Sequence, residues 1–433
     1  MVKLLVSINI LLFSIISYFI AENKEIKHRE NITVCENTLS ENLRKNDGIS
    51  TPLTSVLSTP SAFAIDASKA YSMPLLTLTA KNKVLMSWTE KDDQGLISLF
   101  LSVSNDKGIT FSDKKIIASG YGIGNSRLMK AKILSKKNGN LVAIFMNNPS
   151  AVAPVPGQRG SRGGEISLSE SKDMGNTWSK LKAIDTDLDK GLRGFFDAVV
   201  LPNDEIAVAY LKDVKNSTKH EERDLRVSIT KNGIFQPEKL LDAVVCDCCN
   251  INLLVDVNGA LNVYYRDNND DIRDFARMTS TDNGLTFSKP TIIYNDGWKI
   301  QGCPHSGIVS VKNGKSALLS WYSGAETEIG IRLATQEGKK LMVLTEVTAK
   351  NQTVVGGDKF SIMLWEQNQA IGDKSQMVFI KINDEKITET LAIEGTINGT
   401  NGTALIIDND LIVAHEVKQD NKKNSLKVTV SKL

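Results

Sequence analysis

The sequence predicts an all-β protein, a β-propeller of seven four-stranded blades, with six blades as the alternative. Two repeats support this prediction: paired apolar runs recur about every 50 residues, and an eight-residue motif occurs three times. No helical periodicity follows residue 65. A ring of four-stranded sheets is the architecture that a repeat of this length favours.

The first repeat is a pair of apolar runs joined by a short polar turn, as in "AVVLPNDEIAVAYL" and "INLLVDVNGALNVYY". Asn and Gly between β-rich runs are a strong hairpin signal because both residues tolerate positive φ. Each turn is therefore expected to join the first and second strands of a blade, counted outwards from the centre. The seven turns lie near Asn82, Gly139, Asn203, Gly259, Gly314, Gly357 and Asn409.

The second repeat reads Ser-x-Asp-x-Gly-x-Thr-aromatic. It occurs as "SNDKGITF" at Ser104–Phe111, "SKDMGNTW" at Ser171–Trp178 and "STDNGLTF" at Ser280–Phe287. Its Asp can accept backbone N–H groups within a tight turn, and its Gly can adopt positive φ. We expect these motifs to join third and fourth strands, with Asp106, Asp173 and Asp282 in structural roles.

The last repeat unit ends after its third strand, "LKVTVSKL". An N-terminal strand at Ser61–Ala67 is expected to supply the fourth and close the ring, which removes an open sheet edge. The propeller would then occupy residues 61–433, preceded by a polar linker at residues 22–60.

The N-terminal residues 1–21 hold one lysine and an apolar stretch from Leu4 to Ile20, which is typical of a signal peptide or an N-terminal anchor. Export to a periplasmic or extracellular space is therefore expected, with membrane contact only through an uncleaved N-terminal segment. The formal net charge is +2 and no Lys/Arg run forms a patch, which argues against a nucleic-acid partner.

The Ser-x-Asp-x-Gly-x-Thr-aromatic repeat resembles the Asp-box (bacterial neuraminidase repeat, BNR) motif of the sialidase superfamily, over roughly residues 61–433. The resemblance implies the propeller fold, with the boxes away from the catalytic face. It also implies an alternative function, that of an exo-α-sialidase-type glycoside hydrolase acting on sialoglycoconjugates. Under that hypothesis Asp92 or Asp93 is the acid/base, and the substrate carboxylate is clamped by Arg127, Arg193, Arg266 and Arg273.

Two features of sialidases have no counterpart in the sequence. Their first clamp arginine usually lies in a Phe/Tyr-Arg-Ile-Pro stretch on the first blade, but no arginine occurs between Arg44 and Arg127. Their nucleophile is a late tyrosine paired with a glutamate, but Tyr322 is the last tyrosine here. The sequence therefore favours a ligand- or metal-binding propeller over a sialidase.

Four of the five cysteines lie in two short segments, "VVCDCCNINLL" and "GCPHSG". Both segments are expected to connect the outer strand of one blade to the inner strand of the next, so we expect them to meet at the mouth of the central channel. The residues concerned are Cys246, Cys248, Cys249, Cys303 and His305. The Cys-x-Cys-Cys motif is also similar to a pattern of exported sialidase-family propellers.

The residues leave three interpretations of this cluster open. In an oxidising compartment, Cys303 can form a disulfide with one of the other three cysteines. Thiolates and an imidazole also suit a soft or borderline ion, copper or zinc. The third interpretation is a set of reactive thiols.

The loop "RDNNDDIRD" at Arg266–Asp274 is expected to open on the same face as the cysteines. Its charged side chains can bind an anionic or sugar ligand, or they can pair with one another and order the loop. The predicted partner is a small molecule, a glycan or a protein at the channel mouth. The candidate ligand residues are Arg266, Asp267, Asp271, Arg273 and Trp298.

Overall fold

The computed structural model describes residues 53–155, 164–185, 191, 193–217 and 222–433. The chain divides into two units, Met1–Thr51 and Pro52–Leu433, and the described residues belong to the second. The predicted signal peptide or anchor, the predicted linker up to residue 52 and Cys35 lie outside the described residues. Those residues contain no helix, and hence none that is long and apolar enough to span a membrane.

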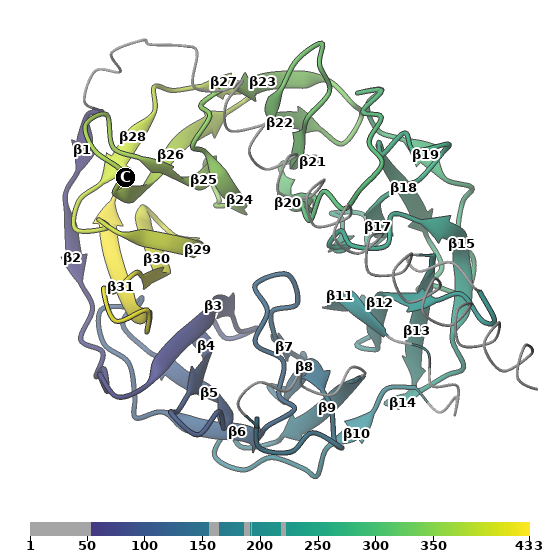
Figure 1. Ribbon diagram of the computed structural model, residues 1–433, viewed down its shortest axis with the longest axis horizontal. Coiled ribbons are helices and arrows are strands. Elements are labelled where there is room, and N and C mark those ends of the chain that lie inside the picture. Colours follow the sequence, from purple (N-terminus) through teal and green to yellow (C-terminus); the bar gives the residue numbers. More distant parts are fainter. Residues whose placement is uncertain (1–52, 156–163, 186–190, 192, 218–221) are drawn as a thin grey trace, which may run out of the picture. The chain divides into compact units, whose positions relative to one another are not determined.

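The second unit is a ring of seven sheets, each built on a four-stranded antiparallel blade, so the prediction of seven blades rather than six is confirmed (Figure 1). The first blade is β3 (Ala70–Leu78), β4 (Val84–Lys91), β5 (Ile97–Ser104) and β6 (Lys115–Gly120). The second is β7 (Lys132–Ser135), β8 (Leu141–Asn147), β9 (Glu165–Ser171) and β10 (Lys182–Ala183). The third is β11 (Arg193–Val200), β12 (Ile206–Asp213), β13 (Arg223–Lys231) and β15 (Lys239–Val245), with β14 (Ile234–Phe235) also paired to β13.

The remaining blades follow in chain order around the ring. The fourth is β16 (Asn252–Val255), β17 (Leu261–Arg266), β18 (Phe275–Ser280) and β19 (Thr291–Ile292). The fifth is β20 (Val309–Asn313), β21 (Ser316–Ser323), β22 (Gly330–Thr335) and β23 (Lys340–Leu344). The sixth is β24 (Lys350–Gly356), β25 (Ser361–Asn368), β26 (Ser375–Asn383) and β28 (Leu391–Ile393), with β27 (Lys386–Ile387) also paired to β26. The seventh contains β29 (Gly399–Ile407), β30 (Asp410–Val417) and β31 (Ser425–Lys432).

An N-terminal strand closes the ring as expected, but its residues differ from the prediction. The strand that pairs antiparallel with β31 is β2 (Ser58–Pro60), not Ser61–Ala67. In addition, β1 (Ser55–Val56) pairs with β28 of the sixth blade. The apolar run at Ser61–Ala67 was misleading because its aromatic residue, Phe63, packs edge-to-face on Trp88 with ring centroids 5.0 Å apart. Within the described run, only the first residues pair with backbone distant in the sequence: Ser61 donates its N–H to Val428 of β31 at 2.9 Å, and Ala62 forms an isolated bridge with Thr110.

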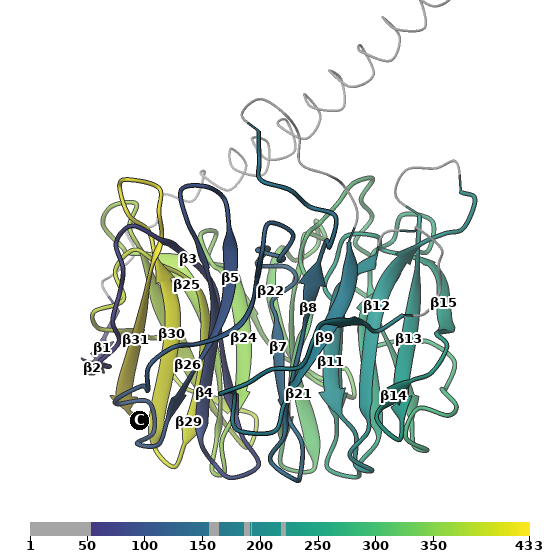
Figure 2. The same cartoon turned by 90° about the horizontal axis from the view of Figure 1, so that it is seen from below.

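The seven predicted hairpin turns all join the first and second strands of their blades, and the three Asp motifs join third and fourth strands. In the first motif the Asp106 carboxylate accepts the backbone N–H of Thr110 at 2.9 Å, and the Ser104 hydroxyl accepts that of Gly108 at 2.8 Å. Each motif thus builds its own turn from side-chain oxygens. Both kinds of turn lie on one face of the ring, opposite the connections between blades (Figure 2).

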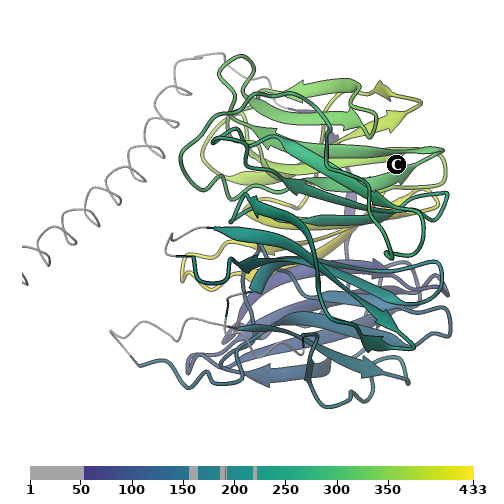
Figure 3. The same ribbon diagram turned by 90° about the vertical axis from the view of Figure 1, so that its right-hand side faces the viewer.

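The hydrophobic core lies between neighbouring blades, which stack face against face around the ring (Figure 3). Leu101 of the first blade and Ile133 of the second belong to one such buried layer. The inner strands of each blade are buried on both faces by the neighbouring blades. The sequence of β8, "LVAIFM", is therefore apolar throughout instead of alternating between apolar and polar residues. This packing holds the loops of the cysteine-bearing face at defined positions around the channel.

Candidate functional site

Cys246, Cys248, Cys249 and Cys303, which we call the cysteine cluster, lie together as the sequence predicted. The sulfur of Cys246 lies 3.2 Å from that of Cys249 and 4.0 Å from that of Cys248. The sulfurs of Cys248 and Cys303 and a ring nitrogen of His305 all lie within 4.8 Å of one another. All four cysteines are free thiols in this structure. Cys248 therefore belongs to two groups of donor atoms at once.

Burial changes across the cysteine cluster. Cys246, Cys248 and Cys249 are at most 3% exposed, and Phe195 packs against them. Cys303 is partly exposed and His305 is exposed. The cluster thus runs from the interior of the ring to a side chain that solvent can reach.

The thiols of the cluster differ in acidity. Burial by itself raises the pKa of Cys249. Hydrogen bonds from the Cys246 and Cys248 thiols and the nearby guanidinium of Arg266 lower it by more, so the net pKa lies well below its ordinary value. Hydrogen bonds to the other thiols raise the pKa of Cys248. The pKa values of Cys249 and Cys248 thus shift in opposite directions within one cluster. The thiolate is the form of cysteine that binds metals and reacts.

Arg266 is a buried structural arginine, only 2% exposed. Its guanidinium donates to the backbone oxygens of Arg273 at 2.5 Å and Tyr322 at 2.9 Å, and to the Ser306 hydroxyl at 3.0 Å. It also lies 4.0 Å from the ring centroid of Phe275. Its donors therefore tie the fourth blade to the fifth.

The other candidate ligand residues of the predicted loop contact one another or their neighbours. Arg273 lies 3.7 Å from the Asp271 carboxylate, Asp267 accepts the backbone N–H of Asn268 at 2.8 Å, and the buried Trp298 packs edge-to-face on a tyrosine. None of the five side chains that the sequence singled out lines the central cavity. Of the two interpretations of this loop, ligand binding or internal pairing, these contacts fit internal pairing that orders the loop.

The channel holds a cavity of about 960 Å³ on the cysteine-bearing face. Its wall is built by the connections that enter the inner strands, including Arg127–Leu128, Asn250–Asn252, His305–Ser310 and Val347–Asn351. A volume of this size suits a small organic ligand. The cysteine cluster does not line the cavity, but its neighbours Asn250 and His305 do.

Basic side chains dominate the charges of the cavity wall. Five basic residues contribute to it, against the single carboxylate of Glu366. Lys132 is paired with Asp197 at 2.7 Å and Lys350 lies 3.7 Å from Glu366. The described residues place no carboxylate within 4.0 Å of the other three cations. The five are Arg127, Lys130, Lys132, Lys350 and Lys418.

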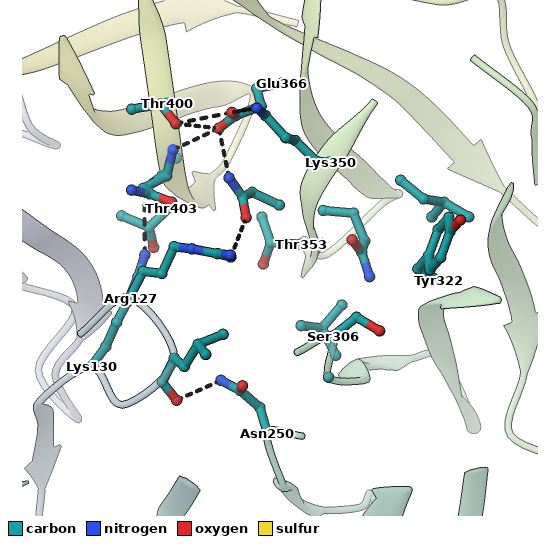
Figure 4. Close-up of a pocket in the computed structure, with 18 of the residues that line it drawn as sticks. Arg127, Lys130, Asn250, Ser306, Tyr322, Lys350, Thr353, Glu366, Thr400 and Thr403 are labelled. Carbon is teal, nitrogen blue, oxygen red and sulfur yellow. Dashed lines mark hydrogen bonds and ion pairs between the residues drawn. The ribbon is translucent and has the colours of Figure 1, made fainter. Parts of the chain in front are cut away.

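Lys130 is the most unusual of these cations. Its ammonium donates to the backbone oxygens of Pro74 and Asn401, at 3.3 Å each, which leaves one of its three donors for a ligand. Burial lowers the pKa of Lys130 to about 8, although the carboxylate of Glu416 opposes the shift. Figure 4 shows Lys130 beside Arg127 on the wall.

Glu366 is the hub of the polar wall (Figure 4). Its carboxylate accepts the Thr400 hydroxyl at 2.8 Å, the backbone N–H of Asn401 at 2.7 Å and the side-chain amide of Asn351 at 3.0 Å. The amide oxygen of Asn351 in turn accepts Arg127 at 3.0 Å. The protein therefore already supplies three groups of donors to the Glu366 carboxylate, and the Lys350 ammonium lies 3.7 Å from it.

A family model described as a BNR repeat-like domain matches residues 89–346, more than half of the 433-residue chain. The chain belongs to the BNR repeat-like family. The resemblance to the Asp-box superfamily that the turn motifs indicated is thus confirmed. No curated protein matches the sequence.

Among solved structures, a protein of unknown function from Dyadobacter fermentans matches this BNR repeat-like chain with 11% identity and a TM-score of 0.50, over 86% of this chain and 98% of its own. A sialidase from Trypanosoma rangeli matches with 14% identity and a TM-score of 0.47, over 88% of this chain and 58% of its own. An α-L-arabinofuranosidase from Fusarium graminearum matches with 12% identity and a TM-score of 0.46, over 89% and 99%. At 11% identity, the similarity to the Dyadobacter fermentans protein shows only that the two chains share a fold.

The arginines proposed for a sialidase-type clamp do not converge in this BNR repeat-like propeller. Arg127 alone among them lines the cavity. Arg193 is buried and pairs with Asp185, while Arg266 and Arg273 lie in the contacts described above. These four arginines, all within the described part of the chain, therefore do not form a three-arginine clamp for a carboxylate.

The two candidate acid/base residues also lie outside the cavity wall. Asp92 accepts the backbone N–H groups of Gln94 at 3.0 Å and Leu96 at 2.9 Å, as a turn-forming aspartate does. Asp93 is exposed and pairs with Lys423 at 2.6 Å. Asp92 therefore shapes the loop between β4 and β5, and Asp93 links that loop to Lys423.

Sequence reasoning missed Lys130, Glu366 and Asn401 as residues of the cavity. These residues come from the connection into β7, from β25 and from β29, which are far apart in the chain. One signal was available: a glutamate near the end of an apolar second strand, as in "SIMLWE" and "LIVAHE". A carboxylate in such a buried position needs partners, so it marks a polar site.

Proposed function

We propose that this protein is a binding propeller that takes a small organic anion into the central cavity, on the face that carries the cysteine cluster. The observation that carries the proposal is the charge of the wall, where three cations, Arg127, Lys130 and Lys418, have no carboxylate within 4.0 Å among the described residues. A low-dielectric cavity with spare basic donors attracts anions.

Arg127 and Lys130 are the anchors of the proposed site. Arg127 uses one terminal nitrogen for Asn351, and no other partner of its guanidinium is found among the described residues. Lys130 has one donor left. A carboxylate or phosphate bridging these two side chains would gain charge-assisted hydrogen bonds, which are stronger than neutral ones.

Isothermal titration calorimetry with N-acetylneuraminate, glucuronate and inorganic phosphate tests the proposal. Lys130→Met removes a charged donor, so the affinity for the best of these anions should fall roughly 10- to 100-fold, the effect of one hydrogen bond to a charged group. The matched control is Lys289→Met, at an exposed lysine in the turn after an Asp box. No binding of any of the three anions at low salt, or equal binding by both variants, would contradict the proposal.

A fluorogenic sialoside assay separates binding from the sialidase alternative. Because only Arg127 of the expected clamp reaches the cavity, we expect no turnover. Turnover that is lost in Arg127→Gln but kept in the folded Lys289→Met control would favour the enzyme.

Export is a separate proposal that rests on the apolar segment from Leu4 to Ile20, outside the described residues. Cell fractionation of the full chain tests it. The expected result is protein in the periplasmic or extracellular fraction, or in the membrane fraction when the segment is not cleaved.

A further inference from the structure

The cysteine cluster and His305 together supply a dense set of soft donor atoms. Cys246, Cys248 and Cys249 form one group whose sulfurs lie within 4.8 Å of one another, and Cys248, Cys303 and His305 form a second. Three evenly spaced donors about 2.3 Å from one ion lie at most about 4.0 Å apart. The donors of either group, which lie within 4.8 Å of one another, would therefore each move by up to roughly half an ångström to hold one ion.

A ring nitrogen of His305 lies within 4.8 Å of the sulfurs of Cys248 and Cys303. The φ of His305 is +48°, in the left-handed region that a few per cent of non-glycine residues adopt. Such conformations persist where the surrounding structure imposes them and are common at ligand sites. Because the imidazole is exposed while Cys248 is buried, the second group offers an entry path from solvent.

The surroundings of the cluster suit an anionic metal–thiolate centre. Arg266 lies close enough to Cys246 and Cys249 for an electrostatic interaction, and the described residues place no carboxylate within 4.0 Å of its guanidinium. A buried cation requires compensating negative charge. The Asp274 carboxylate interacts electrostatically with this guanidinium. Thiolates that keep net negative charge on binding an ion would add to that compensation, and Phe195 shields the buried side of the cluster.

We propose that Cys248, Cys303 and His305 bind a thiophilic closed-shell ion, Zn(II) or Cu(I), with Cys246 and Cys249 as adjacent thiolate donors. Thiolate and imidazole donors favour these ions over Mg²⁺ and Ca²⁺, which prefer oxygen ligands. Binding releases the protons of the ligating thiols to solvent. The two-sulfur, one-nitrogen set leaves a fourth coordination position open on the solvent side, as in zinc sites with an exchangeable ligand.

This inference goes beyond the proposed anion site because the cysteine cluster does not line the cavity. A single disulfide would bridge only two of the four sulfurs and leave the imidazole of His305 without a role. An ion can engage all three donors of the second group at once. The two interpretations therefore predict different thiol counts in the purified protein.

The experiment uses the full chain, purified from its native compartment and, in parallel, reduced under anaerobic conditions. Elemental analysis and thiol counting are done on the first sample. The second is titrated with Zn(II), with Cu(I) buffered by a competing chelator, and with Co(II) as a spectroscopic probe. We expect at least one equivalent of Zn(II) or Cu(I) per chain, and a sulfur-to-cobalt charge-transfer absorption. The competition titrations distinguish the two ions by their relative affinities.

Cys248→Ser, Cys303→Ser and His305→Ala should each weaken binding by roughly 100-fold or more, since even outer partners of metal ligands contribute 10- to 100-fold. Cys35→Ser is the matched control, because Cys35 is the one cysteine outside the two segments. Since His305 is exposed, His305→Ala should fold normally and gives a clear result if a buried variant does not. Absence of bound ion in the reduced chain would overturn the proposal. So would an intact disulfide from Cys303 to another cluster cysteine in the native sample.

Discussion

The carboxylate of Glu366, at the end of the second strand of the sixth blade, accepts the backbone N–H of Asn401 in the seventh at 2.7 Å. Asn401 has a φ of +54° and lies in a bulge of β29. The arrangement recurs one blade further on, where Glu416 accepts the backbone N–H of Met73, whose φ is +57°. Buried glutamates thus link consecutive blades and hold the bulged inner strands that form the cavity wall.

Glu366→Ala should destabilise the protein by about 3 kcal/mol, because it leaves buried donors on Thr400, Asn401 and Asn351 without their acceptor. Urea denaturation followed by tryptophan fluorescence measures the change. Glu389→Ala, at an exposed position, is the control and should change stability little. Equal stability of the two variants would show that the glutamate links contribute nothing.

His415 should make the protein less stable in acid. The side chain is fully buried, and its two ring nitrogens have no hydrogen-bond partner among the described residues. Desolvation, and secondly the charge of Lys427, lower its pKa to about 3. In the unfolded chain His415 binds a proton below a pKa of about 6.5. In the folded chain it binds a proton only near pH 3. Stability present above pH 6.5 is therefore lost as pH falls, by at most about 1.4 kcal/mol per unit from this group.

His415→Leu tests this pH dependence. The substitution replaces an unpaired polar ring by an apolar side chain in the layer between blades, so it should flatten the decline of stability between pH 6.5 and 4. Denaturation midpoints at pH 7 and pH 4.5 give the comparison. An unchanged pH slope in the variant would assign the decline to other groups.

The Asp boxes should matter for folding and not for binding. Asp106→Ala removes the acceptor of the Thr110 backbone and hydroxyl groups, and we expect a loss of about 1–2 kcal/mol because the carboxylate is partly exposed. Asp113→Ala, at an exposed neighbour, is the control. Anion or metal affinity should be unchanged in the folded protein, since the boxes lie on the opposite face. A loss of affinity with an unchanged melting temperature would contradict this assignment.

The box aspartates also make a pH prediction of their own. Hydrogen bonds from Thr177 and Ser171 lower the pKa of Asp173 to about 2. Its folded pKa is depressed, so its contribution to stability is present above about pH 4 and is lost as pH falls toward 2. NMR titration of the carboxyl carbon should give a midpoint well below the ordinary value of 3.8.

Removing residues 1–60 should open the ring. The deletion removes β2 from the seventh blade and β1 from the sixth, which leaves β31 and β28 as exposed edges. We expect a lower melting temperature and self-association detectable by light scattering. A chain that lacks only residues 1–52 keeps both strands and should behave as the full propeller does. Equal melting temperatures of the two truncated chains would mean that closure is not stabilising.

Anion binding should weaken as pH rises through the pKa of Lys130, about 8, because the ammonium loses its charge. For the carboxylates glucuronate and N-acetylneuraminate, whose own charge is constant in this range, the affinity should be nearly constant from pH 6 to 7 and fall between pH 7.5 and 9.5. Calorimetric titration across this range provides the measurement. In Lys130→Met the same decline should be absent, and its persistence would assign the titration to another group.

The sequence by itself determined the fold to a large extent. Hairpin turns and Asp boxes are local features whose residues carry their own geometry, so Asn82, Gly139 and Asp106 predicted strand connections before any packing was known. The blade count followed from their spacing. The meeting of Cys248 and Cys303 followed as well, because both lie at the same place in consecutive repeat units.

Only the tertiary structure decided which side chains line the central cavity. Lys130, Glu366 and Asn401 come from three different blades, and no local pattern shows that their side chains meet. The same limit explains Arg266, which has the residue type of an anion-binding group but is buried against backbone oxygens. Strand connections depend on neighbours in sequence, whereas a site at the ring axis depends on how seven separately built blades pack, and that information is spread over the whole chain.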